Sequence, residues 1–190
     1  QSPFFDLSTL QHPFLSLLIY WESERVYDGS NSQYSLNGGT TWANVGSFSD
    51  PVNCLNQNWY NTANITNLTT LATVKEGWSG NIQPTAGSCQ GGSGSAGWKL
   101  ATHCISYLAG QPNVIFRFTF GAGTTCNNFD GIAFDDFGIS EAPANTADFT
   151  YTCNGNTVTF NGITTLCPDT LLWDFGDAGQ GKPASDTSDT

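Results

Sequence analysis

The sequence contains no methionine, two histidines and only five lysines and arginines among its 190 residues. Against these five basic residues stand 16 acidic ones, which gives a formal net charge of −11. Proteins that bind nucleic acid use clustered Lys and Arg to contact phosphates, so we expect no nucleic-acid partner. An anionic membrane surface is disfavoured for the same reason. A divalent cation is the partner that such an acidic chain favours.

Long apolar runs and helical periodicity are also missing. No run is long enough for insertion into a membrane, and no helix-length window has apolar residues at helical spacing. Two segments, 14–21 and 113–120, alternate between apolar and other residues instead. Such alternation predicts half-buried strands. The apolar residues at every second position are Leu15, Leu17, Ile19 and Trp21 in the first segment, and Val114, Phe116, Phe118 and Phe120 in the second.

Turn-forming residues separate these segments. The stretch "QYSLNGGTTW" (33–42) predicts a hairpin that turns at Asn37-Gly38-Gly39. A Gly/Ser-rich stretch between 79 and 97 predicts a long loop that Cys89 tethers. Several short strands joined by polar turns predict an all-β fold, a β-sandwich.

The six cysteines lack CxxC spacing, and the chain has too few histidines for a typical zinc site. An even number of cysteines predicts disulfides and an oxidising compartment. Cys153 and Cys167 flank one hairpin-like stretch, so we expect them to pair. The other four allow three pairings, which spacing does not decide. Proximity along the chain favours Cys54 with Cys89 and Cys104 with Cys126.

The composition changes around "EAPANTAD" (141–148), where a Pro/Ala/Asn-rich linker follows the last apolar segment. We therefore predict a first domain over 1–142, a linker over 143–146 and part of a second domain over 147–190. The second region is too short for an independent core. The chain also has no initiator methionine and no signal peptide, which favours a processed chain or a fragment.

A set of motifs in the first domain resembles the MAM-like, concanavalin-A-like jelly-roll modules of large secreted surface proteins of gliding and related Bacteroidota. These motifs are "SPFFDLS" (2–8), "SERVYDG" (23–29), "SLNGGTTW" (35–42), "NWYN" (58–61), "GWSG" (77–80), "GWKLATHCISYLAG" (97–110), "FRFTFGAG" (116–123) and "DGIAFDDFGI" (130–139). In that family strands precede the first motif, so the resemblance implies that the domain's first strands lie before Gln1. The second region resembles the start of a PKD domain, whose hallmark is "WDFGD" (173–177), although Ala178 stands where that family usually has glycine.

The resemblance implies a non-catalytic module for adhesion or binding in a secreted, cell-surface protein. Such a module is expected to serve a gliding-motility adhesin exported by the type IX secretion machinery, with neighbouring domains and surface glycans or proteins as partners. Two alternatives stay open: an accessory module of a secreted protease or glycosidase, and a structural spacer.

Three aspartates interrupt the apolar stretch "DGIAFDDFGI". Ile132 and Phe134 stand at even-numbered positions, whereas Phe137 and Ile139 stand at odd-numbered ones. Because side chains alternate between the two faces of a strand, a regular strand cannot place all four on one face. A β-bulge at Asp135-Asp136 would restore the register. The alternative is a strand that is buried on both faces.

Several carboxylates without nitrogen or sulfur ligands are typical of a calcium site. A bulge would re-aim one carboxylate toward those of "SERVYDG", and jelly rolls of this kind often carry a structural calcium ion. We therefore predict a structural calcium site, with solvated turns as the alternative. Its expected ligands are Glu24, Asp28, Asp130, Asp135 and Asp136.

Catalysis has little support in the sequence. Glu22, Glu24, Asp135 and Asp136 could form an acid–base pair. However, the motifs G-x-S-x-G and H-E-x-x-H and the P-loop do not occur. We expect no enzymatic activity.

The six tryptophans are candidates for ligand stacking where they lie in loops. Trp21, Trp42, Trp98 and Trp173 stand in strand-like patterns and are expected in the core. The loop motifs "NWYN" and "GWSG" contain the candidate stacking residues Trp59, Tyr60 and Trp78.

Overall fold

The computed structural model describes residues 1–70, 74–143, 147–155 and 157–164. The chain divides into two units, Gln1–Ala142 and Pro143–Thr190. The first unit contains two three-stranded antiparallel sheets, and the second contains a two-stranded sheet. The predicted all-β fold is confirmed.

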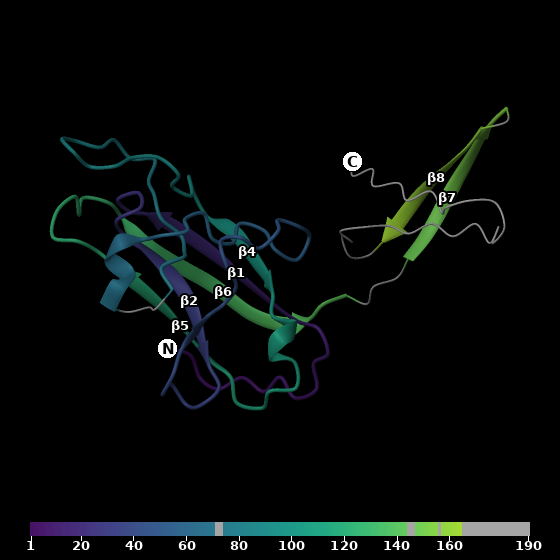
Figure 1. Cartoon of the computed structure of the whole chain (residues 1–190), viewed down its shortest axis with the longest axis horizontal. Helices are drawn as coiled ribbons and strands as arrows, with labels where there is room; N and C mark the ends of the chain where they lie inside the picture. The colour runs from purple at the N-terminus through teal and green to yellow at the C-terminus, as the bar shows by residue number, and fades with distance from the viewer. Residues whose placement is uncertain (71–73, 144–146, 156, 165–190) are drawn as a thin grey trace. The chain divides into compact units, whose positions relative to one another are not determined.

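The first sheet has the order β4-β1-β6, with β1 (Pro13–Glu22) between β4 (Lys99–Cys104) and β6 (Gly131–Glu141) (Figure 1). Burial along β1 alternates as its sequence predicts. The side chains that point inward are each at most 7% exposed: Leu15, Leu17, Ile19 and Trp21.

The second sheet has the order β3-β2-β5, formed by β3 (Ala43–Asn44), β2 (Gly29–Ser35) and β5 (Ile115–Gly121). The predicted hairpin joins β2 to β3. Asn37 holds its turn, because the side-chain oxygen of Asn37 accepts a hydrogen bond from the N–H of Thr41 at 2.9 Å. In β5, Ile115 and Phe116 are both buried, whereas Phe120, which the alternation places on the buried face, is 39% exposed, so the predicted alternation does not hold along the whole strand.

The hydrophobic core combines residues of the two sheets and of the long loops. Leu17 of β1, Ala101 of β4 and Phe116 of β5 meet Trp59 and Trp78 of the loops. Two short 3-10 helices, η1 (Thr66–Thr70) and η2 (Ser106–Leu108), complete this unit. Among the described residues, no helix is long and apolar enough to cross a lipid bilayer.

In the second unit, β7 (Ala147–Asn154) and β8 (Thr157–Thr164) form an antiparallel hairpin. Cys153 lies on β7 opposite Val158 and is an exposed free thiol, so the predicted Cys153–Cys167 disulfide is wrong. Cys167, Trp173 and the "WDFGD" motif lie outside the described residues.

Candidate functional site

The aromatic residues predicted to stack on a ligand are buried instead. Trp59, Tyr60 and Trp78 are 8%, 6% and 0% exposed. The Trp78 ring lies edge-on to both others, at centroid distances of 5.0 Å from Trp59 and 4.8 Å from Tyr60. Their polar atoms are also satisfied by backbone carbonyls. The indole N–H of Trp59 donates to the carbonyl of Val45, and that of Trp78 donates to the carbonyl of Asn58. The Tyr60 hydroxyl donates to the carbonyl of Ser32. This cluster belongs to the core, and its prediction as a stacking site is wrong.

The small residues of β2 explain why these loop aromatics are buried. Ser30 and Trp78 exchange both backbone hydrogen bonds, at 2.9 and 2.8 Å, so the loop pairs with β2 as an extra bridge. A Cβ atom at Gly77 would lie 2.1 Å from the Ser30 carbonyl oxygen, and one at Gly29 would lie 2.3 Å from that of Trp78. Glycine at both positions therefore allows the two backbones to approach closely.

Trp98, which was expected in the core, is exposed. It directly precedes β4, and 53% of its surface is accessible. Its ring lies 6.2 Å from that of Tyr20 on β1, on the face of the sheet that points away from the core. Leu100, also 53% exposed, pairs with Leu18 on the same face. We call this set the outer face: Leu18, Tyr20, Trp98 and Leu100.

Polar groups border the outer face. Asp130 accepts hydrogen bonds at one carboxylate oxygen from the Tyr20 hydroxyl, at 3.1 Å, and from the Gln83 side-chain amide, at 2.6 Å. Desolvation, this hydrogen bond and the nearby negative charge raise the pKa of Tyr20 above its ordinary value. The hydroxyl therefore stays protonated and acts as a donor at neutral pH. The face combines an exposed indole with hydrogen-bonding groups at its border.

The predicted bulge at Asp135-Asp136 is confirmed. Ser16 and Leu18 pair with Gly138 and Asp135, so two steps along β1 match three steps along β6. Asp136 takes up the extra residue with a φ of 48°. As a result Ile132, Phe137 and Ile139 all pack against the core.

The five predicted calcium ligands lie in different places. Asp135 and Asp136 are exposed on β6, opposite the middle of β1, and Asp130 borders the outer face. Glu24 and Asp28 are buried in the segment between β1 and β2. No three of the five bring carboxylate oxygens within 4.8 Å of one another. The structure therefore does not assemble the predicted set, because the bulge leaves both of its aspartates on the solvent side.

Three buried carboxylates gather at the β1–β2 connection, and one of them was not among the predicted ligands. Glu22, Glu24 and Asp28 are 0%, 7% and 3% exposed. No lysine or arginine of the described residues forms an ion pair with them. Burying a carboxylate without an opposite charge is costly unless hydrogen bonds or a metal compensate. Strict alternation along β1 predicts that Glu22 points outward to solvent. For this reason the sequence did not reveal Glu22 as a buried acid.

These carboxylates accept hydrogen bonds from neutral N–H groups. Glu22 accepts from the backbone N–H of Ile82 at 2.9 and 3.0 Å. Glu24 accepts from the N–H of Gln90 at 3.1 Å. Asp28 accepts at one oxygen from the Asn67 side chain and the Gly123 N–H, at 2.7 and 2.8 Å. Glu22 and Glu24 therefore both hold the 79–97 loop, and Asp28 holds η1 and the loop between β5 and β6.

A cavity of about 100 Å³ opens between the β1–β2 connection and the loop that joins β5 to β6. Glu22 and Asp28 both line it, together with Cys126 and Asn127. The Glu22 and Asp28 carboxylates offer oxygen, which is the donor type that Ca²⁺ prefers, whereas Phe120, Ala122 and Phe129 make much of the remaining lining apolar.

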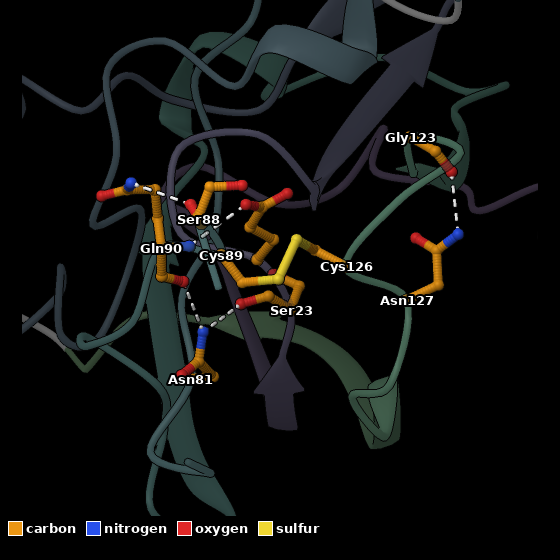
Figure 2. Close-up of a disulfide and its surroundings, with 9 residues drawn as sticks. Ser23, Asn81, Ser88, Cys89, Gln90, Gly123, Cys126 and Asn127 are labelled. Atoms are coloured by element: carbon orange, nitrogen blue, oxygen red, sulfur yellow. Dashed lines mark hydrogen bonds between the residues drawn. A yellow bond between two sulfur atoms is a disulfide. The ribbon is translucent and has the colours of Figure 1, made fainter. Parts of the chain in front are cut away.

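One disulfide closes this region, and it differs from the predicted pairs. Cys89 is bonded to Cys126, with a Cα–Cα distance of 5.6 Å (Figure 2). The predicted pairs Cys54–Cys89 and Cys104–Cys126 are therefore wrong; Cys54 is disulfide-bonded elsewhere, and Cys104 is a free thiol. Proximity along the chain misled the prediction, because the loop at 79–97 folds back toward the loop between β5 and β6.

Hydrogen bonds next to the disulfide hold the loop in place. The Asn81 side-chain N–H group donates to the carbonyls of Ser23 and Gln90, at 2.8 and 3.0 Å (Figure 2). Glu24, Cys89 and Cys126 bring potential ligand atoms within 4.8 Å of one another. Both sulfurs are consumed by the disulfide, so only the carboxylate remains as a strong ligand.

No protein-family model, curated protein or solved structure matches this chain. The resemblance to MAM-like and PKD modules therefore stays a prediction.

Proposed function

We propose that this chain is a non-catalytic binding module of a secreted, cell-surface protein and that its outer face contacts the ligand. The observation that carries the proposal is the exposed Trp98 ring beside the half-buried Tyr20 ring on the outer face, bordered by Asp130 and Gln83. Exposed indole and phenol rings supply large contact area with a polar tip, as binding surfaces commonly do. Glycans are the ligand class that this combination favours, since sugars offer apolar C–H faces and hydroxyl groups together.

Charge narrows the class of glycan. The chain carries a net charge of −11, and Asp130 and Asp135 lie on or beside the outer face. Sialylated or sulfated glycans would meet like charge there, so neutral glycans or amino sugars are favoured. A cell-surface adhesin, such as a gliding-motility adhesin exported by type IX secretion, is the parent protein that fits this role best.

The two buried glutamates have a structural role that does not require catalysis. Glu22 and Glu24, which were considered as an acid–base pair, accept hydrogen bonds from backbone N–H groups of the 79–97 loop. These contacts anchor the loop, so both carboxylates serve the fold.

A glycan array probed with the 190-residue chain tests the function directly. We expect retention of neutral or amino-sugar glycans, and we expect Trp98→Ala to weaken binding at least about tenfold, as loss of a central aromatic contact does. Trp42→Ala is the matched control, because Trp42 lies beside the other sheet under the Arg117 guanidinium, 4.1 Å from its ring centroid. Equal binding by wild type and Trp98→Ala would mean that the ligand binds at another site. If no glycan is retained at all, the alternative of a structural spacer is favoured.

Calcium is proposed as a structural partner of the same domain. The cavity lined by Glu22 and Asp28 supports this placement, because both carboxylates are buried and neither has a cationic partner among the described residues. These residues replace the exposed Asp135 and Asp136 as the expected ligands.

A chelator is therefore expected to lower the melting temperature of the wild-type chain. An ion present at about 100 times its dissociation constant stabilises a fold by about 2.7 kcal/mol. Glu22→Gln and Asp28→Asn should remove the response, whereas the control Asp135→Asn should keep it. An unchanged wild-type melting curve, followed by calorimetry with chelator and with added calcium, would contradict the calcium proposal.

A further inference from the structure

The Cys89–Cys126 disulfide joins two connections that are far apart in the sequence (Figure 2). Cys89 belongs to the 79–97 loop, and Cys126 belongs to the loop between β5 and β6. Both cysteines are half-buried, and their neighbours Ser88 and Asn127 are exposed. A small-molecule thiol can therefore reach the disulfide from solvent.

A carboxylate from a third segment lies beside the two sulfurs. One oxygen of Glu24, in the β1–β2 connection, and the sulfurs of Cys89 and Cys126 all lie within 4.8 Å of one another. Glu24 is 7% exposed, and its Oε1 accepts a hydrogen bond from the Gln90 N–H at 3.1 Å. No described residue donates a hydrogen bond to its Oε2. The Glu24 carboxylate therefore retains lone pairs for a further partner.

Reduction of the disulfide would turn these three side chains into a set of metal ligands. Two small-molecule thiols supply two electrons, which break the sulfur–sulfur bond and leave two protein thiols, while the small thiols are oxidised to their own disulfide. Each protein thiol can then lose its proton to solvent. Two thiolates beside a buried carboxylate carry three negative charges, and such a cluster favours a bound cation.

The donor atoms select the metal. Thiolate sulfur is a soft ligand that suits zinc, whereas calcium binds oxygen ligands. Zinc in four-coordinate sites has bonds of about 2.3 Å to sulfur and about 2.1 Å to oxygen. Tetrahedral angles then place neighbouring ligand atoms about 3.6–3.8 Å apart, which lies within the 4.8 Å that spans these three atoms already. Small rotations of the side chains suffice to form the site, and water can supply the fourth ligand.

We propose that Glu24, Cys89 and Cys126 form a zinc site when the disulfide is reduced. The disulfide holds this point of the fold under oxidising conditions, and a zinc ion holds it under reducing ones. Binding joins both sulfurs and one Glu24 oxygen to zinc and releases the two thiol protons. The ion thus keeps the 79–97 loop, the β1–β2 connection and the β5–β6 loop together. This site is separate from the outer face and from the proposed calcium site, whose ligands are oxygens in the oxidised chain.

Melting of the 190-residue chain with and without zinc tests the proposal. The oxidised chain is compared with the chain reduced by a small-molecule thiol, which is then removed in the absence of air. Zinc at about 100 times its dissociation constant should raise the melting temperature of the reduced chain by at least about 5 °C. It should leave that of the oxidised chain unchanged. Cadmium, which takes the same ligands, should give the ultraviolet absorption of cadmium–thiolate bonds at one ion per chain.

Three variants locate the ion. Cys89→Ser should weaken zinc binding by the reduced chain at least about 100-fold, because loss of an outer-shell partner alone costs about 10–100-fold. Glu24→Gln should weaken it at least about tenfold, since an amide oxygen carries no charge. Cys104→Ser is the matched control, because it removes a free thiol outside the site, and it should bind zinc as the wild type does.

Equal zinc affinities of the wild type and Cys89→Ser would overturn the proposal, because other thiols would then hold the ion. A reduced wild type whose melting temperature zinc leaves unchanged would overturn it too. If the reduced chain is unfolded without metal, zinc should restore the near-ultraviolet circular dichroism of the wild type but not that of Cys89→Ser. Restoration in both or in neither would again contradict the zinc site. The glycan and calcium experiments use the oxidised chain, so their outcomes are independent of this one.

Discussion

Replacement of Trp78 by alanine is expected to lower the free energy of unfolding by about 3–5 kcal/mol, the usual cost of truncating a buried Trp. Trp78 is completely buried and touches the rings of Trp59, Tyr60 and Phe118. Its loss leaves a large cavity between the loops and β2. Chemical denaturation followed by circular dichroism measures the change.

Trp98→Ala provides the matched control for this prediction. It removes the same side chain from a half-exposed position on the outer face. Surface substitutions usually change stability by about 0.5 kcal/mol or less, and this one should stay near that range. Similar losses in the two variants would contradict the assignment of Trp78 to the core and of Trp98 to the surface.

Removal of the Cys89–Cys126 disulfide is expected to cost about 4 kcal/mol. The bond links residues that are 37 positions apart, and the chain-entropy relation gives this value for a loop of that length. The double variant Cys89→Ser/Cys126→Ser also frees the loop that supplies N–H groups to Glu22 and Glu24. Urea unfolding of the oxidised and variant proteins measures the loss.

Cys104→Ser is the control for the disulfide, because Cys104 is a free thiol of similar size whose sulfur lies 3.1 Å from the Ser106 hydroxyl. It should change stability little. Peptide mapping without reduction should recover Cys89 and Cys126 in one linked fragment. Recovery of Cys89 linked to Cys54 would contradict the structure.

The local patterns of the sequence predicted β1, the bulge in β6 and the first hairpin, but the alternation along β5 only in part. Alternation in 14–21 identified the buried face of β1, because a strand that is covered on one side imposes a period of two. The change of parity within "DGIAFDDFGI" predicted the bulge at Asp135-Asp136 for the same reason. Asn37-Gly38-Gly39 predicted the hairpin, since its turn requires residues that tolerate a positive φ.

The loops could not be predicted in this way. Whether Trp78 or Trp98 is buried depends on contacts between segments that are distant in sequence, such as the bridge from Ser30 to Trp78. The same holds for the pairing of Cys89 with Cys126. The small residues of β2 were the one local signal, because they leave room for large side chains above the strand. Glu22 was missed because the loop that covers it lies 60 residues further along the chain.

We propose that the ligand binds at the outer face and not at the buried loop tryptophans. The most direct measurement follows the indole N–H signals of the six tryptophans by two-dimensional NMR while a glycan retained on the array is added. Trp98→Phe assigns its signal by deletion. We expect the Trp98 signal to shift with saturation while those of Trp59 and Trp78 stay in place. Shifts at Trp59 or Trp78 with an unmoved Trp98 signal would contradict the account.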